Sequence, residues 1–170
     1  WSGGFAGMKG VKVITDKTAD LMKSIKSLTT NQLLVGIPSD KAKRKDGDDA
    51  IDNAGLGFIH EYGSPLQNIP ARPSLIPGVK KVSDQCADII AKGAADAILG
   101  GSAALDKAFT KAGLIAQASV RATLTAGEGF EPLAQSTLDA RERIGAKGTK
   151  PLIRTGQIRN SFTFVVRRRG

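Results

Sequence analysis

The residues of this sequence that could carry out chemistry are one histidine, one cysteine and a set of carboxylates. His60 is followed directly by Glu61, and Cys86 stands alone. Neighbouring residues of a helix point about 100° apart, and no second histidine completes a metalloprotease motif, so His60 and Glu61 are not expected to share a catalytic site. A single cysteine forms neither an internal disulfide nor a cysteine metal cage. We therefore expect no enzyme, no cofactor and no metal, and we expect His60 to be partly buried and hydrogen-bonded to the backbone.

Length and composition favour one domain. With 170 residues, 41% of them apolar, the chain can build one real core, which we expect over residues 11–170. Residues 1–10 are Gly-rich and are expected to form a flexible extension, with Met8 as an alternative translational start. We expect no secretory signal in them, and no apolar run of the sequence approaches the roughly 20 residues of a membrane span. We therefore expect synthesis in the cytoplasm and no membrane partner.

The charge of the chain points to an acidic partner. Twenty-five Lys and Arg against sixteen Asp and Glu give a formal net charge of +9. Such a charge favours nucleic acid, an anionic membrane or an acidic protein surface, and does not by itself choose among them. Aromatic residues make up only 5% of the chain, which leaves few rings for stacking on single-stranded bases.

The hydrophobic pattern predicts an α+β fold, in which a small few-stranded sheet packs against two long helices. Apolar stripes at helical spacing predict the long helices at 82–99 and 103–125. The other predicted elements are a strand at 11–16, a helix to about 28, a strand at 33–37, helices at 54–62 and 136–144, a turn or short helix at 155–160 and a strand at 161–167. Residues 39–52, where acids and bases are interleaved, are predicted to be a solvated loop, and three prolines stiffen the loop at 64–74.

Three short segments carry the most specific information. They are GFIHEYGS at 57–64, IPARPSLIPGV at 69–79 and PLIRTGQIRNSFTFVV at 151–166. In this order the segments resemble the tail-completion and minor tail proteins of long-tailed bacteriophages, often called virion morphogenesis proteins, which act in head-tail joining. The family usually carries Phe where this chain has Ser74. The resemblance spans roughly residue 11 to the end.

The resemblance implies a structural protein of the virion. It implies a subunit that forms a ring, a hexamer, at the head-proximal end of the tail, assembled in the host cytoplasm. The implied partners are other copies of the chain, a tail terminator or tail tube protein, the head-side connector proteins, and DNA in the lumen. Arg72 in the stiff loop is expected to hold carbonyls or a carboxylate, either at an interface or within its own domain. The residues expected at interfaces are Pro70, Arg72, Pro73, Arg159, Arg167, Arg168 and Arg169.

Two alternatives remain open at this point. The first is a basic DNA-binding protein acting on the packaged or exiting genome, because residues 145–170 contain seven Lys and Arg and no acid. The second is a virion hydrolase centred on His60 and Glu61. Salt-dependent binding to duplex DNA would favour the first, and a cleavage activity lost on changing His60 would favour the second.

Overall fold

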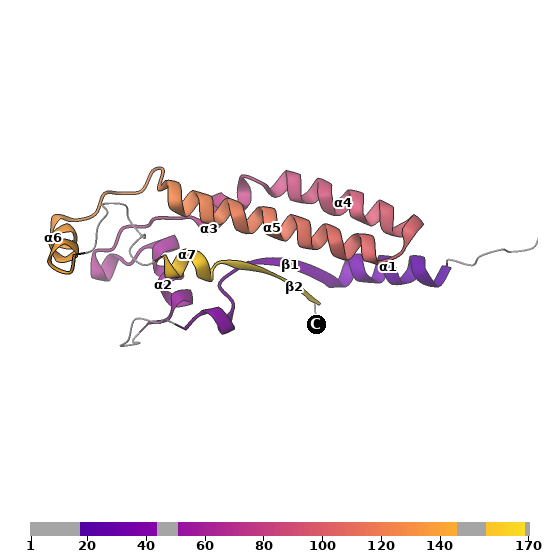
Figure 1. Cartoon of the computed structure of the whole chain (residues 1–170), viewed down its shortest axis with the longest axis horizontal. Helices are drawn as coiled ribbons and strands as arrows, with labels where there is room; N and C mark the ends of the chain where they lie inside the picture. Colours follow the sequence, from indigo (N-terminus) through magenta and orange to yellow (C-terminus); the bar gives the residue numbers. More distant parts are fainter. Residues whose placement is uncertain (1–17, 44–50, 146–155, 169–170) are drawn as a thin grey trace, which may run out of the picture.

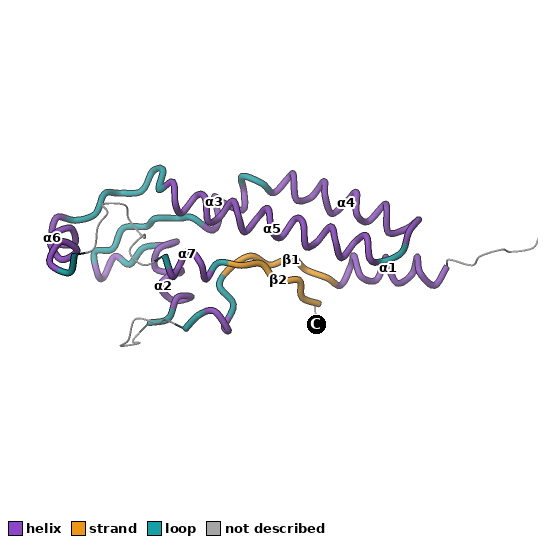
Figure 2. The backbone as a smooth tube through the Cα atoms, viewed as in Figure 1, coloured by secondary structure: helices purple, strands orange, loops and turns teal. Residues whose placement is uncertain are grey.

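The computed structural model describes residues 18–43, 51–145 and 156–168 (Figure 1). The predicted strand at 11–16, the expected extension at 1–10 and Arg169 lie outside these residues. Most of the described chain is helical (Figure 2). The elements are α1 (Thr18–Thr30), β1 (Asn31–Gly36), α2 (Asn53–Tyr62), α3 (Leu75–Lys80), α4 (Ser83–Gly100), α5 (Ala103–Ala126), α6 (Gln135–Arg143), α7 (Gln157–Ser161) and β2 (Thr163–Arg168), with 3-10 turns at Ser39–Lys41 and Pro65–Gln67.

Helix α5 is the central element. Its 24 residues run through the middle of the molecule, with α4 packed along one side and the two strands along another (Figure 1). The helix ends where Gly127 adopts a left-handed conformation with φ 65°, which glycine tolerates without strain. Small residues bring α4 and α5 close, since a Cβ added at Gly93 would overlap the Cβ of Ala108. The small residues of α4 and α5 thus allow the two helix backbones to pack closely.

The described sheet consists of β1 and β2, which pair antiparallel. Leu33 lies opposite Val166, and Val35 lies opposite Phe164. Residues directly opposite each other share a face, and both Leu33 and Val35 pack against clusters built on α5. A Cβ at Gly113 of α5 would overlap the Phe164 ring, so the sheet approaches the helix closely at this glycine.

The core is a row of three clusters along α5. Near the start of α5, Leu105 and Phe109 pack with Ala97 of α4, and in the middle Ala112 and Ala116 pack with Cys86. Near the end of α5, the buried side chains of the third cluster are Val120, Leu124, Ile158 and Phe162. The second half of α5 thus packs against the chain segment that follows residue 156.

The α+β class with a small sheet and two long helices is confirmed. The helices and strands predicted from 33 onward match the observed ones closely, apart from α3, which the sequence did not predict because Pro77 and Gly78 lie inside it. The solvated loop predicted at 39–52 is wrong in its first part, where Ser39–Lys41 forms a 3-10 turn and Ala42 is buried. The helix predicted before residue 28 is present as α1, but its apolar stripe is exposed, with Met22 61% and Ile25 46% accessible. No helix in the described ranges combines the length and hydrophobicity needed to cross a membrane.

Candidate functional site

Parts of all three segments that carry the resemblance lie near the C-terminal end of α5, where Phe58, Ile76 and Phe162 line one hollow. Ile158 and Phe162, from the third segment, pack against Val120 and Leu124 of α5, and Leu56 of α2 and Leu75 of α3 pack on the same cluster. The side chain of Asn53 at the start of α2 donates a buried hydrogen bond of 3.1 Å to the Ser161 hydroxyl. This hydrogen bond connects α2 with α7, which are about 100 residues apart in the chain.

Glu61 links two of these segments and is buried. Its Oε2 accepts hydrogen bonds from the backbone N–H groups of Ser74 and Leu75 at 2.8 and 2.9 Å, and its Oε1 accepts one from Ile76 at 2.8 Å. These are the N–H groups that the first turn of α3 leaves without helical partners, and Pro77 in the same turn has none to donate. The carboxylate thus acts as the N-terminal cap of α3, and both of its oxygens are engaged.

Arg72 is turned towards its own chain. Only 7% of the residue is exposed, and its guanidinium donates hydrogen bonds to the carbonyls of Glu131 and Pro132 at 3.1 and 3.2 Å. Arg72 was expected to bind either at an interface or within its own domain, and these contacts support the role within its own domain. They leave little of the Arg72 side chain accessible to a partner. Pro70 is half-buried and Pro73 exposed, and the interface role expected for the loop stays a prediction.

His60 is half-buried, as expected, but its expected side-chain hydrogen bond is missing. In the part of the chain that the structure describes, its Nδ1 is buried without a hydrogen-bond partner. Burial, with a smaller contribution from the positive charge of Arg72, lowers the pKa of His60 from 6.5 to about 4. Because the Glu61 oxygens are occupied by α3, the two adjacent side chains form no acid-base pair in this arrangement.

An apolar hollow of about 270 Å³ opens beside Glu61. Phe58 and Tyr62 of α2 stand at it with their ring centroids 4.8 Å apart, and they are 65% and 60% exposed. Ile76 of α3, 54% exposed, also lines it, while Phe162 forms part of its lining from the core. By helical spacing Tyr62 shares one side of α2 with Leu56 and Ile59, yet it is exposed. We call Phe58, Tyr62 and Ile76 the apolar rim.

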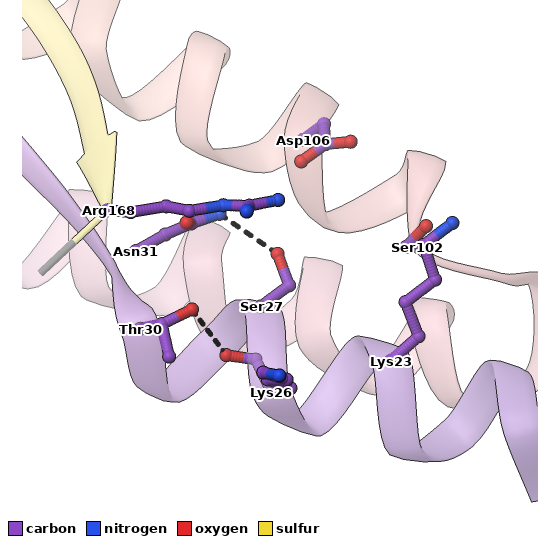
Figure 3. Close-up of a pocket in the computed structure, with 8 residues that line it drawn as sticks. All are labelled: Lys23, Lys26, Ser27, Thr30, Asn31, Ser102, Asp106 and Arg168. Atoms are coloured by element: carbon purple, nitrogen blue, oxygen red, sulfur yellow. Dashed lines mark hydrogen bonds between the residues drawn. The ribbon is translucent and has the colours of Figure 1, made fainter. Parts of the chain in front are cut away.

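The predicted basic residues do not form one group. Arg159 lies on α7 near the convergent segments and is half-buried, whereas Arg167 and Arg168 are exposed at the end of β2. Arg168 lines a polar hollow of about 350 Å³ together with Lys23 and Lys26 of α1 (Figure 3). No sequence pattern indicated that α1 lies beside the end of β2, because this placement follows from the pairing of Asn31 with Arg168.

Neither a metal-binding site nor a reactive thiol site is formed by the residues that the structure describes. No three His, Cys, Asp or Glu side chains there are grouped so that they could hold a metal ion. Cys86 is 9% exposed, and burial raises the pKa of its thiol, which donates a hydrogen bond to the carbonyl of Ala112 at 3.4 Å. Its surroundings are those of a packing residue.

Compared with known proteins, the chain matches no family model, no curated protein and no solved structure.

Proposed function

We propose that this protein is a structural subunit of a long-tailed bacteriophage virion, which completes the tail at its head-proximal end and takes part in head-tail joining. In this role copies of the chain form a ring and contact tail and connector proteins. In this proposal the protein functions by binding to neighbouring subunits and catalyses no reaction.

One observation carries the proposal. Two of the segments that resemble the tail-completion family are neighbours in the sequence and the third begins more than 70 residues later, yet side chains from all three line one hollow near the end of α5. Their meeting place holds the apolar rim, whose large side chains are exposed beside a hollow. Exposed aromatic side chains around a hollow are typical of surfaces that dock other proteins.

The experiment is a deletion of the gene from the phage or prophage that encodes the chain, followed by electron microscopy of the lysate. We expect filled heads and separate tails, with joining restored when the protein is supplied from a plasmid. A lysate of complete, infectious virions would overturn the proposal. So would a lysate without filled heads, which would place the protein in an earlier step.

DNA binding is the second candidate function. The observation that favours it is the gathering of Lys23, Lys26 and Arg168 at one hollow with a single acid, Asp106. This hollow lies near the start of α5, whereas the apolar rim lies near its other end, so the two candidate functions use different surfaces.

A further inference from the structure

The hollow at the start of α5 is built by four elements, which come from three parts of the chain that are remote in sequence. Lys23, Lys26, Ser27 and Thr30 come from α1, Asn31 begins β1, Arg168 ends β2, and Ser102 and Asp106 come from the start of α5. Figure 3 shows Arg168 reaching into the space between α1 and α5, with Asp106 on the α5 side and Lys23 rising from α1. The antiparallel pairing of Asn31 with Arg168 brings the basic end of β2 to the last turn of α1.

The lining of this hollow is suited to an anion. All eight lining residues are polar or charged, and three cations face one carboxylate, so the formal charge is +3 − 1 = +2. The Ser27 hydroxyl accepts a hydrogen bond from Asn31 Nδ2 at 2.9 Å, which leaves its own hydrogen free to donate to a ligand. Arginine forks, lysines and hydroxyls are the groups that proteins use for phosphate oxygens.

None of the lining residues has a hydrocarbon or aromatic side chain, so the hollow is not built for a lipid acyl chain. The chain carries a formal net charge of +9, and a polyanion with many repeated charges, such as DNA, is attracted by this positive charge over a long range. No aromatic residue lines the hollow, so base stacking plays no part there and the contact would be independent of sequence.

We propose that this hollow binds a backbone phosphate of duplex DNA, with Lys23, Lys26, Ser27 and Arg168 as the donors. The inference deepens the second candidate function and does not depend on the role in tail completion. The carboxylate of Asp106 opposes the phosphate and keeps the affinity of each subunit moderate, which suits DNA that must move past the protein.

The test measures binding of the full chain to a fluorescent 30-base-pair duplex at several salt concentrations. A Lys26→Gln, Arg168→Gln variant should bind about tenfold more weakly, and its salt slope should fall by about one, because the contact to one phosphate is lost. The matched control is Lys107→Gln, Lys111→Gln, which removes the same charge from exposed positions of α5 outside the hollow and should change the affinity by less than about threefold.

A variant with the opposite sign excludes misfolding as the cause. Asp106→Asn should raise the affinity about two- to fivefold, because a repelling charge leaves the hollow. Equal weakening by the two double variants, or an unchanged affinity in Asp106→Asn, would overturn the proposal. An unlabelled poly-glutamate competitor distinguishes the ligand: displacement of the duplex at equal charge concentration would assign the hollow to acidic protein and reject the phosphate.

Discussion

At the residue scale, Glu61 and Arg72 each stabilise a segment remote from their own. Glu61 caps α3 from the end of α2, and Arg72 holds the carbonyls of residues 131 and 132. Both side chains are buried and charged, and each makes several charge-assisted hydrogen bonds that compensate for lost hydration. The segment around His60 is therefore held by polar contacts as well as by apolar packing.

Replacing Glu61 with Gln should destabilise the fold. The amide keeps one accepting oxygen but turns an NH₂ group towards N–H groups of α3, and it removes the negative charge at the helix start. We expect a loss of about 1 to 3 kcal/mol in the free energy of unfolding, measured by urea denaturation. The control Glu142→Gln, on the exposed face of α6, should change it by less than about 0.5 kcal/mol. Equal effects would show that the cap contributes nothing beyond surface charge.

His60 should make the protein less stable in mild acid. The pKa of His60 is about 4 in the folded chain against 6.5 without burial, so between these values the unfolded chain binds a proton that the folded chain does not. The free energy of unfolding is therefore unaffected by the titration of His60 above pH 6.5, and it decreases as the pH falls from 6.5 towards 4. The full difference corresponds to about 3 kcal/mol, which partial exposure of the ring reduces to about 1 to 2 kcal/mol.

The measurement is the difference in unfolding free energy between the parent and His60→Gln as a function of pH. Carboxylates titrate in both proteins, so the difference isolates the histidine. We expect the advantage of the parent over the variant to shrink by about 1 to 2 kcal/mol from pH 7 to pH 4. A constant difference over this range would mean that His60 titrates normally in the folded chain.

At the scale of elements, glycines set the distances at which helices and sheet pack. The sheet can lie on α5 because Gly113 leaves room for the Phe164 ring. Helix α3 can lie on α5 because Gly78 has no side chain, and a Cβ there would come within 2.7 Å of the Val120 Cα. Val120 is fully buried and Phe164 is half-buried against α5, so in both cases an added methyl group would require a neighbour to shift.

Gly113→Ala should therefore destabilise the protein although alanine favours helix. Overpacking costs about 1 to 3 kcal/mol, and the gain in helix propensity of about 1 kcal/mol offsets part of it. Thermal unfolding should show a lower Tm for Gly113→Ala and a smaller effect of the same change in a Phe164→Leu background. If the two effects were equal, the ring would not be the cause.

At the scale of the whole molecule, large apolar side chains remain exposed at both ends of α5. Met22 and Ile25 of α1 lie near its start, and the apolar rim lies near its end. When one surface of each copy contacts a different surface of the next copy, the copies form a ring if the rotation between neighbours adds up to a full turn. This arrangement is compatible with the proposed assembly.

The apolar rim should affect association far more than stability. Phe58→Ser, Tyr62→Ser removes two exposed rings, so the unfolding free energy of the monomer should change by less than about 1 kcal/mol. Incorporation into tails in a complementation assay should fall at least tenfold if the rim is an interface centre. The control is Leu114→Ser, 54% exposed on α5, which should be incorporated normally. Normal incorporation of the double variant would exclude the rim from the assembly contacts.

Much of the secondary structure is determined by the sequence alone. The apolar stripes at 82–99 and 103–125 and the glycines after them predicted α4 and α5, because periodicity and capping are local properties. The alternation in 161–167 and the apolar run at 33–37 predicted two strands for the same reason.

Only the tertiary structure decided what the charged and aromatic side chains do. Helix α3 begins because a carboxylate 13 residues earlier accepts its N–H groups, and no local pattern around Pro77 indicates this. Tyr62 lies at helical spacing from Leu56 and Ile59, yet Leu56 packs on the core cluster while Tyr62 is exposed at the edge of a hollow. Arg168 meets Lys23 and Lys26 only through the pairing of β1 with β2, a contact between residues more than 130 positions apart. Spacing along the chain specifies which side chains share an element, and the packing of elements specifies which of them meet.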